Sequence, residues 1–476
     1  MRKLLRVAEE EPVLVILLAG FAVAFLTIFP PHLLVTDSFL TLAAGREIAE
    51  HGLPYEDTLT VIGAGTEWVD QQWGAQLVAY GVFELGGHAL LAVLTGALVV
   101  AAFVIAAAGA RRLGAGPRAI VIVFFPVILA APWAWTIRAQ LFALPLFTAL
   151  VWLLASEARH PSRRAFLAIP MLVVWANLHG SVALGALLTM LLAASEIAQR
   201  RGGSVARSLA LLVLAPVAVL ATPYGPGETA RYYEMMLTDP PFADRVTEWQ
   251  PSHPGTDTLV FYLLALLAAA AVLWGRRRLR PFDVATLVVT FAGAVLAIRG
   301  IPWFALACMV LLPVALGTKL EDAAAPVRRS LNRVLALAAG AVVAVTVAVA
   351  LARDASWYER EWPSAALDAV KSSAGADERV FATDRHADWL LWKLPGLRGR
   401  IAYDVRFELY DQAFFDRLAS YKLQRGDWKE LATGYRVIVV DELPDETPTD
   451  GLLAEPGARS LYSDDRVTVV LRPPAA

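Results

Sequence analysis

Cysteine is nearly absent from this sequence. Cys308, the single cysteine among 476 residues, lies within an apolar run, which excludes a disulfide framework and a thiolate metal cluster and favours a packing role. No internal repeat occurs, and the residues after 353 contain no glycine-rich nucleotide-binding motif. A nucleotide site built on such a motif is therefore not expected in that region.

Charged residues are also scarce. They make up 18% of the chain, against 57% hydrophobic residues, and the mean hydropathy is +0.53. One soluble core could not bury so much apolar surface, so the chain requires a lipid environment. The formal net charge of −2 gives no indication of nucleic acid as a partner.

Apolar windows long enough to cross roughly 30 Å of hydrocarbon recur along the chain. The predicted fold class is a polytopic α-helical membrane protein with a C-terminal soluble α/β domain. The first window follows the basic start MRKLLR without a small-residue cleavage site, so we expect a retained signal anchor. About eleven transmembrane helices are expected, in the windows 12–30, 88–110, 119–135, 139–156, 165–178, 181–198, 208–223, 257–274, 283–298, 301–317 and 331–352.

Basic residues sort to one side of these windows. With the N-terminus in the cytoplasm, every cytoplasmic segment carries an arginine or lysine cluster, as in RRLGAGPR, EARHPSRR and GRRRLR, in agreement with the positive-inside rule. The opposite side then holds the first loop, a longer loop at 224–254 and everything after residue 353. We expect a multi-pass protein of a bacterial-type inner or plasma membrane, with its C-terminal part extracytoplasmic.

The chain changes character near residue 354, where the long apolar runs stop. Residues 1–353 are predicted to form the transmembrane domain, which includes an outer first loop at 32–87. Residues 354–476 are predicted to form an extracytoplasmic soluble α/β domain. Its patterns predict helices at 363–373, 386–394, 410–422 and 427–433, and strands at 379–382, 400–404, 435–440 and 466–471.

The first loop is too polar to span a membrane and too patterned to be a linker. Apolar residues recur at helical spacing from Phe39 to Ile48 and from Trp73 to Phe83. This spacing predicts two amphipathic helices that lie in the membrane interface. Trp68 and Trp73 are expected to anchor them at the depth of the lipid headgroups.

Asp37 follows the first window directly, and its position has two interpretations. Thr36 or Asp37 could cap the helix that follows, because side-chain oxygens there satisfy free backbone N–H groups. Alternatively, a partly desolvated carboxylate at this place could act as a general base, since desolvation raises its pKa toward the working pH. One aspartate does not decide between them.

Arg138 and Arg299 interrupt apolar sequence, in WAWTIRAQLF and LAIRGIPWF. Snorkelling to the interface is the structural alternative for an arginine at the end of a span. Both arginines, however, fall on the outer side, against the charge bias, and beside aromatic residues. Guanidinium groups at this depth would suit a phosphate held at the membrane surface, because their planar fork matches phosphate oxygens.

Two further loops place polar residues on the same side. His179 lies in the reversal WANLHGS, where a structural hydrogen bond and a phosphate or hydroxyl contact are both open interpretations. Glu248 and Trp249 lie in TEWQP and could hold a sugar by stacking and hydrogen bonding. The alternative for Glu248 is an ion pair with Arg245 or Arg231.

The arrangement resembles the GT-C superfamily of membrane glycosyltransferases, which use sugars linked to a polyprenyl phosphate. The segments that carry the resemblance are TDSFLTLAAGREIAEHGLPYEDT, GTEWVDQQWGAQLVAYGVFELGG, IRAQLF, WANLHGS, TPYG and TEWQP. The resemblance implies a polyprenyl-phosphate-linked sugar as donor. Its other partners would be the lipid bilayer and an unknown acceptor, which is a glycan, a lipid or a protein.

The resemblance also implies roles for individual residues. Asp37 matches the first-loop acid that takes the proton of the acceptor in an inverting hexosyl transfer on the extracytoplasmic face. Arg138 and Arg299 fall where basic residues meet the donor phosphate, and His179 is grouped with them. Sugar or acceptor contacts are expected from Glu56, Asp57, Trp68, Gln71, Tyr224, Glu248 and Trp249.

The chain departs from the family pattern in two places. Ser38 follows Asp37 where many protein mannosyltransferases have a second acid, and the WWDYG signature of oligosaccharyltransferases is absent. No cofactor is implied with certainty. Glu56 and Asp57 are the one pair of outer-loop acids that leaves a divalent metal open.

Two alternative functions compete with this interpretation. A transporter or lipid flippase would place polar residues near the bilayer midplane and often shows inverted repeats, whereas here the polar residues lie at outer span ends and no repeat occurs. A polymerase or ligase that acts on lipid-linked glycans would share the donor and differ in the acceptor. The sequence does not separate it from a transferase.

Overall fold

The computed structural model describes residues 10–199, 205–238, 240–275, 277–317, 328–442 and 448–473. The chain divides into two compact units, each assembled from three separate segments. The helical unit comprises Met1–Leu33, Gly86–Pro226 and Thr247–Asp354, and the mixed unit comprises Leu34–Leu85, Gly227–Val246 and Ala355–Ala476. One junction falls at the predicted boundary near residue 354. The first loop, however, belongs with the C-terminal residues and not with the apolar helices.

Helices occupy all eleven apolar windows within the described residues. Five helices, including α13 extended by one 3-10 turn, are long and apolar enough to cross a membrane by length and composition. The window 165–178 is split into a 3-10 helix, Arg163–Leu167, and the short α7. The helices are α2 (Pro12–Ile28), the second part of α4 (Trp73–Arg112), α5 (Pro117–Ala130), α6 (Gln140–Glu157), α7 (Ala168–Ala176), α8 (Val182–Gln199), α9 (Val205–Val219), α11 (Leu259–Gly275), α12 (Pro281–Leu296), α13 (Ile301–Leu316) and α14 (Arg329–Leu351).

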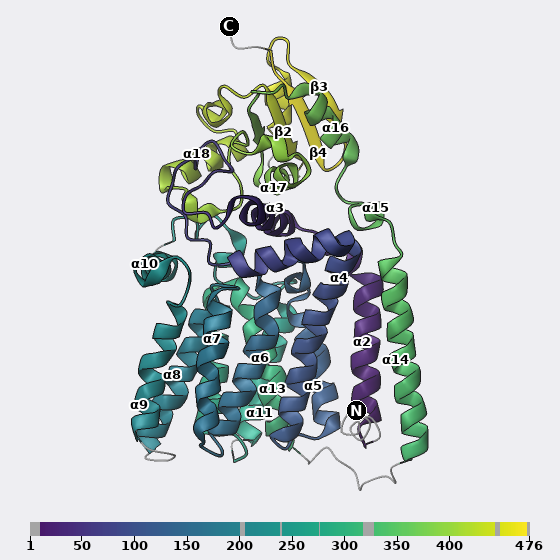
Figure 1. Cartoon of the computed structure of the whole chain (residues 1–476), viewed down its shortest axis with the longest axis vertical. Helices are drawn as coiled ribbons and strands as arrows, with labels where there is room; N and C mark the ends of the chain where they lie inside the picture. The colour runs from purple at the N-terminus through teal and green to yellow at the C-terminus, as the bar shows by residue number, and fades with distance from the viewer. Residues whose placement is uncertain are drawn as a thin grey trace. The chain divides into compact units, whose positions relative to one another are not determined.

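The helical unit is a bundle with one central helix. Every residue of α13 is buried. This helix packs against α5, α6 and α11, which Figure 1 labels beside it, and also against α12. By contrast, α14 pairs with α2 and leaves Val334, Leu337 and Val345 more than half exposed. Apolar side chains that face outward along a whole helix are what a lipid-facing surface requires.

Helix α4 is bent where the chain passes from one unit to the other. Gly86 and Gly87 interrupt the helix with non-helical angles, and Gly87 has φ +60°. This left-handed conformation is favourable for glycine, which has no Cβ. The residues before the bend form the second predicted amphipathic helix of the first loop, and those after it form the second apolar window.

The mixed unit contains a four-stranded sheet in the order β1-β2-β4-β3. The strands are β1 (Val380–Ala382), β2 (Val437–Asp441), β3 (Arg459–Ser463) and β4 (Val467–Leu471). The β1–β2 pair is parallel, with Phe381 opposite Ile438, and the other two pairs are antiparallel. The strands predicted at 379–382, 435–440 and 466–471 are confirmed, whereas β3 was not predicted.

Helices of the mixed unit cover the sheet. Within the described residues, α16 (Ser364–Ser373) packs against β3 and β4, and α17 (Asp384–Lys393) packs against β1 and β2. A further helix, α18 (Gln412–Lys422), also agrees with prediction. The segment predicted as a helix at 427–433 is a 3-10 helix, Trp428–Ala432. The C-terminal part is thus an α/β fold, as its alternating patterns predicted.

The first loop contributes the helix α3 (Thr36–His51), which packs against α17. Arg46 donates hydrogen bonds to the carbonyls of Leu391 and Trp392 at 2.7 and 2.9 Å. These are terminal carbonyls of α17, which lack partners inside the helix and attract a cation. Gly45 lies against the backbone of Gln76 so closely that a Cβ there would clash. The first loop therefore folds as part of the mixed unit.

The strand predicted at 400–404 is wrong. Ile401 instead forms isolated bridges with both Val380 and Thr60. The Val61 N–H donates to the Ile401 carbonyl at 2.8 Å, and the Ala402 N–H donates to the Val380 carbonyl at 3.0 Å. This segment lies between the edge strand β1 and the first loop and forms only a single bridge to each. Its backbone is therefore paired over too few residues to form a regular strand.

Candidate functional site

Five of the predicted site residues meet at one place in the helical unit. Arg138 Nη1 donates to Glu248 Oε1 at 2.6 Å, and the guanidinium carbon of Arg299 lies 4.1 Å from the ring centroid of Trp249. Glu248 and Trp249 belong to the 3-10 helix η4 (Thr247–Trp249). His179 completes this group, which we call the cation cluster.

Backbone pairing holds η4 beside the segment that carries Arg299. The Ile298 N–H donates to the Gln250 carbonyl at 3.0 Å, and the Ser252 N–H donates to the Val295 carbonyl at 2.9 Å. Arg299 itself lies in the 3-10 helix η5 (Ile298–Gly300), between α12 and α13. Two chain segments that are distant in sequence are thereby paired like short strands, which fixes Trp249 against Arg299.

His179 is buried in the turn between α7 and α8. Its Nδ1 accepts the Ser181 N–H at 3.1 Å and lies 2.7 Å from Ser181 Oγ, while its ring lies 6.5 Å from that of Trp303, centroid to centroid. Burial, and then the charges of Arg299 and Arg138, lower the pKa of His179 to about 3. At neutral pH this imidazole is therefore uncharged and offers hydrogen bonds only.

The ion pairs expected as the alternative for Glu248 are wrong. Arg231 pairs with Glu228, and Arg245 Nη2 lies 2.9 Å from Asp416 Oδ1. Glu248 pairs with Arg138 instead, across 110 positions of sequence. The carboxylate that sequence proximity assigned to neighbouring arginines thus belongs to the cation cluster.

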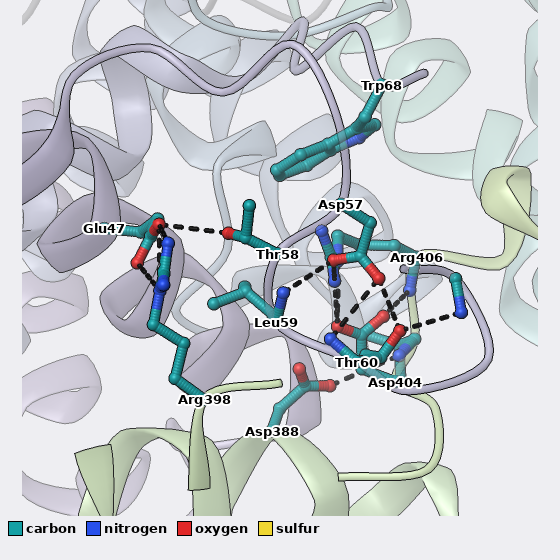
Figure 2. Close-up of polar contacts among 12 residues, drawn as sticks. Glu47, Asp57, Thr58, Leu59, Thr60, Trp68, Asp388, Arg398, Asp404 and Arg406 are labelled. Atoms are coloured by element: carbon teal, nitrogen blue, oxygen red, sulfur yellow. Dashed lines mark hydrogen bonds and ion pairs between the residues drawn. The ribbon is translucent and has the colours of Figure 1, made fainter. Parts of the chain in front are cut away.

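A second group of charged residues lies in the mixed unit, around Arg406 (Figure 2). Arg406 Nη2 donates to Asp57 Oδ1 at 2.5 Å, and Arg406 Nε donates to Asp404 Oδ2 at 2.8 Å. The side chains of Asp57, Asp404 and Arg406 are at most 1% exposed. Asp57 also accepts the Leu59 N–H at 2.9 Å and the Thr60 hydroxyl at 2.5 Å. We call this group the carboxylate network.

Trp68 belongs to this network and is not an interfacial anchor as predicted. Its ring lies 4.4 Å from the guanidinium carbon of Arg406, and its Nε1 donates to Glu408 Oε1 at 3.3 Å. The residue is 5% exposed. A cation over an indole is favourable where water is excluded, so Trp68 holds Arg406 in place. The buried Nη1 of Arg406 has no hydrogen-bond partner among the described residues.

Further buried acids adjoin the network. Asp388 has one carboxylate oxygen, Oδ1, with no partner among the described residues, and its pKa is raised well above the usual range by burial and by the charges of Asp404 and Asp37. Burial likewise raises the pKa of Asp70 to about 7. Asp37 lies within electrostatic reach of Asp388, in the first turn of α3.

The N-cap of α3 is a residue other than Asp37. Val35 holds the N-cap position of α3, and the Val35 N–H donates to Ser38 Oγ at 2.9 Å. Thr36 and Asp37 are the first two residues of the helix. The interpretation of Thr36 or Asp37 as the N-cap is therefore wrong, and Ser38 supplies the side-chain oxygen at the start of this helix.

The other predicted contact residues are distributed over both units. Glu56 is exposed and pairs with Glu67 through the backbone, whereas its neighbour Asp57 is buried. Gln71 is buried, and its Oε1 has no partner among the described residues. Tyr224 is buried in the helical unit, ahead of α10 (Gly225–Thr238). Among the described residues, no group of three or more His, Cys, Asp or Glu side chains could hold a metal ion.

Sequence reasoning missed most of the carboxylate network. Asp388, Asp404, Arg406 and Glu408 lie in segments that read as ordinary soluble sequence, including IAYDVRFELYD. The available signal was the placement of four charges within a short, otherwise apolar and aromatic stretch. Buried charges of this kind require partners, and two of those partners, Asp57 and Trp68, come from the first loop, more than 300 positions away.

Comparisons with known proteins concern the fold. No protein-family model and no curated protein matches the sequence. Among solved structures, ArnT from Cupriavidus metallidurans bound to undecaprenyl phosphate aligns with a TM-score of 0.52 and 15% identity, over 96% of this chain and 97% of that chain. Its apo state aligns with a TM-score of 0.53.

A second similar structure is much longer. The arabinofuranosyltransferase AftD from Mycobacteria aligns with a TM-score of 0.53 and 16% identity, over 99% of this chain and 40% of that chain. Both are GT-C membrane glycosyltransferases, and similarity at this level of identity concerns the fold. The chain is a multi-pass membrane protein with the fold of the GT-C superfamily, which confirms the resemblance inferred from its loops.

Proposed function

We propose that the chain transfers a sugar, a hexosyl group, from a polyprenyl-phosphate-linked donor to an acceptor hydroxyl, with inversion at the anomeric carbon. The observation that carries the proposal is the cation cluster, in which Arg138, Arg299 and an uncharged His179 lie together in a bundle of apolar helices. The ArnT structure contains undecaprenyl phosphate, a ligand of the class proposed here.

The cation cluster would bind the donor phosphate. When the bond between the anomeric carbon and the phosphate oxygen breaks, negative charge develops on the phosphate. Fixed guanidinium groups stabilise that charge without reorganising, and they do so best where water is largely excluded. Arg138 has a side chain only 18% exposed, which satisfies this condition. His179 would donate or accept a hydrogen bond without adding charge.

Asp37 would act as the general base. The acceptor oxygen attacks the anomeric carbon, its proton passes to the Asp37 carboxylate, and the lipid phosphate leaves with the bonding electrons. A positioned base of this kind contributes about 10²- to 10⁴-fold to the rate. Asp37 lies within electrostatic reach of Asp388, whose pKa is raised by burial, and this supports the assignment because perturbed acids are typical of sites that handle protons.

The acceptor contacts are proposed to be Glu56, Gln71 and Tyr224. Gln71 has a buried oxygen without a partner among the described residues, as expected of a group that awaits a ligand hydroxyl. For Asp57 and Trp68 we propose a structural role through Arg406, because both are buried against it. Trp249 stays a candidate for stacking on the sugar. No step of the proposed reaction is routed through a metal.

The proposed location is a bacterial-type inner or plasma membrane, with the reaction on the extracytoplasmic face. Arg138 precedes α6 and Arg159 follows it, so the cation cluster and the basic segment EARHPSRR lie at opposite ends of one helix. Since basic clusters mark the cytoplasmic side, the cation cluster is proposed to face outward.

The test is a transfer assay with purified full-length protein and radiolabelled polyprenyl-phosphate sugars. We expect Asp37→Asn to reduce turnover by about 10²-fold or more while lipid-phosphate binding is kept. Asp368→Asn, which changes an exposed acid of α16 in the same way, should leave turnover unchanged. Turnover that survives Asp37→Asn would remove Asp37 as the base.

A further inference from the structure

The cation cluster contains a carboxylate that a site built only to hold an anion would not need. Glu248 Oε1 lies 2.6 Å from Nη1 of Arg138, so it meets the guanidinium that the proposed function assigns to the donor phosphate. The same 3-10 helix, η4, places Trp249 against Arg299. One short element thus presents an acid to one cation and an aromatic ring to the other.

The named side chains of the cluster have a net charge of one. Arg138 and Arg299 supply two positive charges, Glu248 supplies one negative charge, and burial keeps His179 neutral. A lipid-linked sugar donor is a phosphodiester and has one negative charge. The lipid phosphate left after transfer is a monoester, which has a charge of about −1.5 to −2 at pH 7. Counted over these four side chains, the charge equals in size that of the donor and is smaller than that of the product.

We propose that Glu248 makes the cation cluster favour a singly charged lipid phosphodiester over the lipid phosphate monoester, and so promotes departure of the leaving group. The inference rests on the proposed function, and it assigns Glu248 to specificity and product release instead of sugar contact. Transfer itself breaks the carbon–oxygen bond of the diester and creates the second ionisable oxygen. Once that second oxygen is ionised, the Glu248 carboxylate repels the lipid phosphate more strongly than it repelled the donor.

The size of the effect follows from the exposure of the pair. The side chain of Arg138 is 18% exposed and that of Glu248 is 36% exposed, so water and salt screen part of the repulsion. We expect the affinity for the monoester relative to the diester to change about threefold to tenfold. This size corresponds to repulsion between the Glu248 carboxylate and a phosphate a few ångströms away when both are partly solvated. Glu248→Gln tests the charge alone, because the amide oxygen can still accept the hydrogen bond from Arg138.

The experiment uses the full-length chain in nanodiscs of uncharged lipid and two probes with the same tail, decyl phosphate and decyl methyl phosphate. Dissociation constants are measured by calorimetry at pH 7.5, with empty nanodiscs as the partition blank. Glu248→Gln is compared with the wild type and with Asp257→Asn. Asp257 is an exposed acid of the helical unit that is not a member of the cluster, so its substitution removes the same charge without changing a cluster residue.

We expect Glu248→Gln to tighten binding of the monoester severalfold more than binding of the diester, with both ratios unchanged in Asp257→Asn. If both probes bind and Glu248→Gln leaves their ratio at the wild-type value, the inference about Glu248 is overturned and the phosphate site stands. If neither probe binds the wild type above the blank, the proposed phosphate site fails and the inference fails with it. Equal melting temperatures of the three proteins check that the fold is intact.

Discussion

The two units of this protein differ in how their charged side chains are paired and buried. In the helical unit, buried acids pair with arginines near helix ends, as Asp283 does with Arg159 and as Glu157 and Glu196 do with Arg207, and Glu248 pairs with Arg138. In the mixed unit, buried acids outnumber buried basic residues. Arg406 is the one arginine or lysine that is buried among the described residues of that unit. The buried carboxylates of the same unit are Glu47, Asp57, Asp70, Asp388, Asp404 and Asp441.

The difference indicates which chemistry each unit suits. A pair of guanidiniums in an apolar bundle attracts an anion, because little water is present to screen the charge. Carboxylates that are buried together hold protons at higher pH, since desolvation and mutual repulsion both disfavour the ionised form. The helical unit is thus suited to a phosphate, and the mixed unit to a hydroxyl and its proton.

The largest effect is expected from replacing the buried arginine of the mixed unit, Arg406. Arg406→Met leaves Asp57 and Asp404 buried without their cation, which should cost about 3–5 kcal/mol of unfolding free energy. Hydrogen exchange of the amides of Val61, Ile62 and Gly399 should become much faster, because their hydrogen bonds join the first loop to the C-terminal residues. Arg425→Ala, at an exposed position of the same unit, is the control. Unchanged protection in Arg406→Met would contradict a structural role for the network.

A pH-dependent effect is expected at Asp70. Because burial raises its pKa from 3.8 to about 7, folding favours its protonated form. This contribution is complete below about pH 4, declines as the pH rises toward 7 and is absent above it. Asp70→Asn should remove that decline, worth on the order of 2–4 kcal/mol, so the variant should gain stability relative to the wild type at pH 8. If the melting temperatures of Asp70→Asn and the wild type change in parallel from pH 5 to 8, this prediction is wrong.

The cation cluster can be tested next. Arg299→Gln removes a charge but keeps a polar side chain near Trp249. The proposed hydrogen bonds from the Arg299 guanidinium to the phosphate would be lost, and such charge-assisted bonds are worth about 1.5–3 kcal/mol. We expect lipid-phosphate affinity to fall about tenfold to a hundredfold, with the melting temperature nearly unchanged. Arg118→Gln, in the first turn of α5, serves as a matched control. An equal loss in both variants would point to general surface charge.

The smallest effect is expected at the solvent-facing edge of the mixed unit. Arg398 makes a two-pronged contact with Glu47, but its side chain is 42% exposed. Water screens such pairs, so Arg398→Ala should cost about 1 kcal/mol or less. The comparison with Arg406→Met in the same denaturation assay isolates the effect of burial. A loss as large as that of Arg406→Met would show that burial does not set the difference.

Hydropathy predicted the helices well because lipid-facing and core-facing residues are both apolar, so every apolar window stands out. The strands β2 and β4 were also predictable from their β-branched runs. β3 was missed, since Arg459–Ser463 is largely exposed and lacks an apolar pattern. The failure at 400–404 has a different cause: Ile401 pairs with two segments at once, which only the tertiary fold decides.

The candidate site, like the fold, was only partly predictable from the sequence. Arg138, His179 and Arg299 stood out because charge is costly inside apolar sequence, and the structure brings them together. Arg406 did not stand out, because its partner Asp57 lies 349 positions earlier. The pairing of Glu248 with Arg138 was likewise invisible, since nearby arginines offered simpler partners. The role of Asp37 as a base stays a prediction.

The most direct test of the account is a structure of the full-length chain in nanodiscs with a bound polyprenyl phosphate. We predict density for the phosphorus within hydrogen-bonding reach of Arg138 or Arg299, at the end of α6 that carries the cation cluster. A phosphate bound instead beside Arg159 or Arg207, at the other end of α6, would contradict the account.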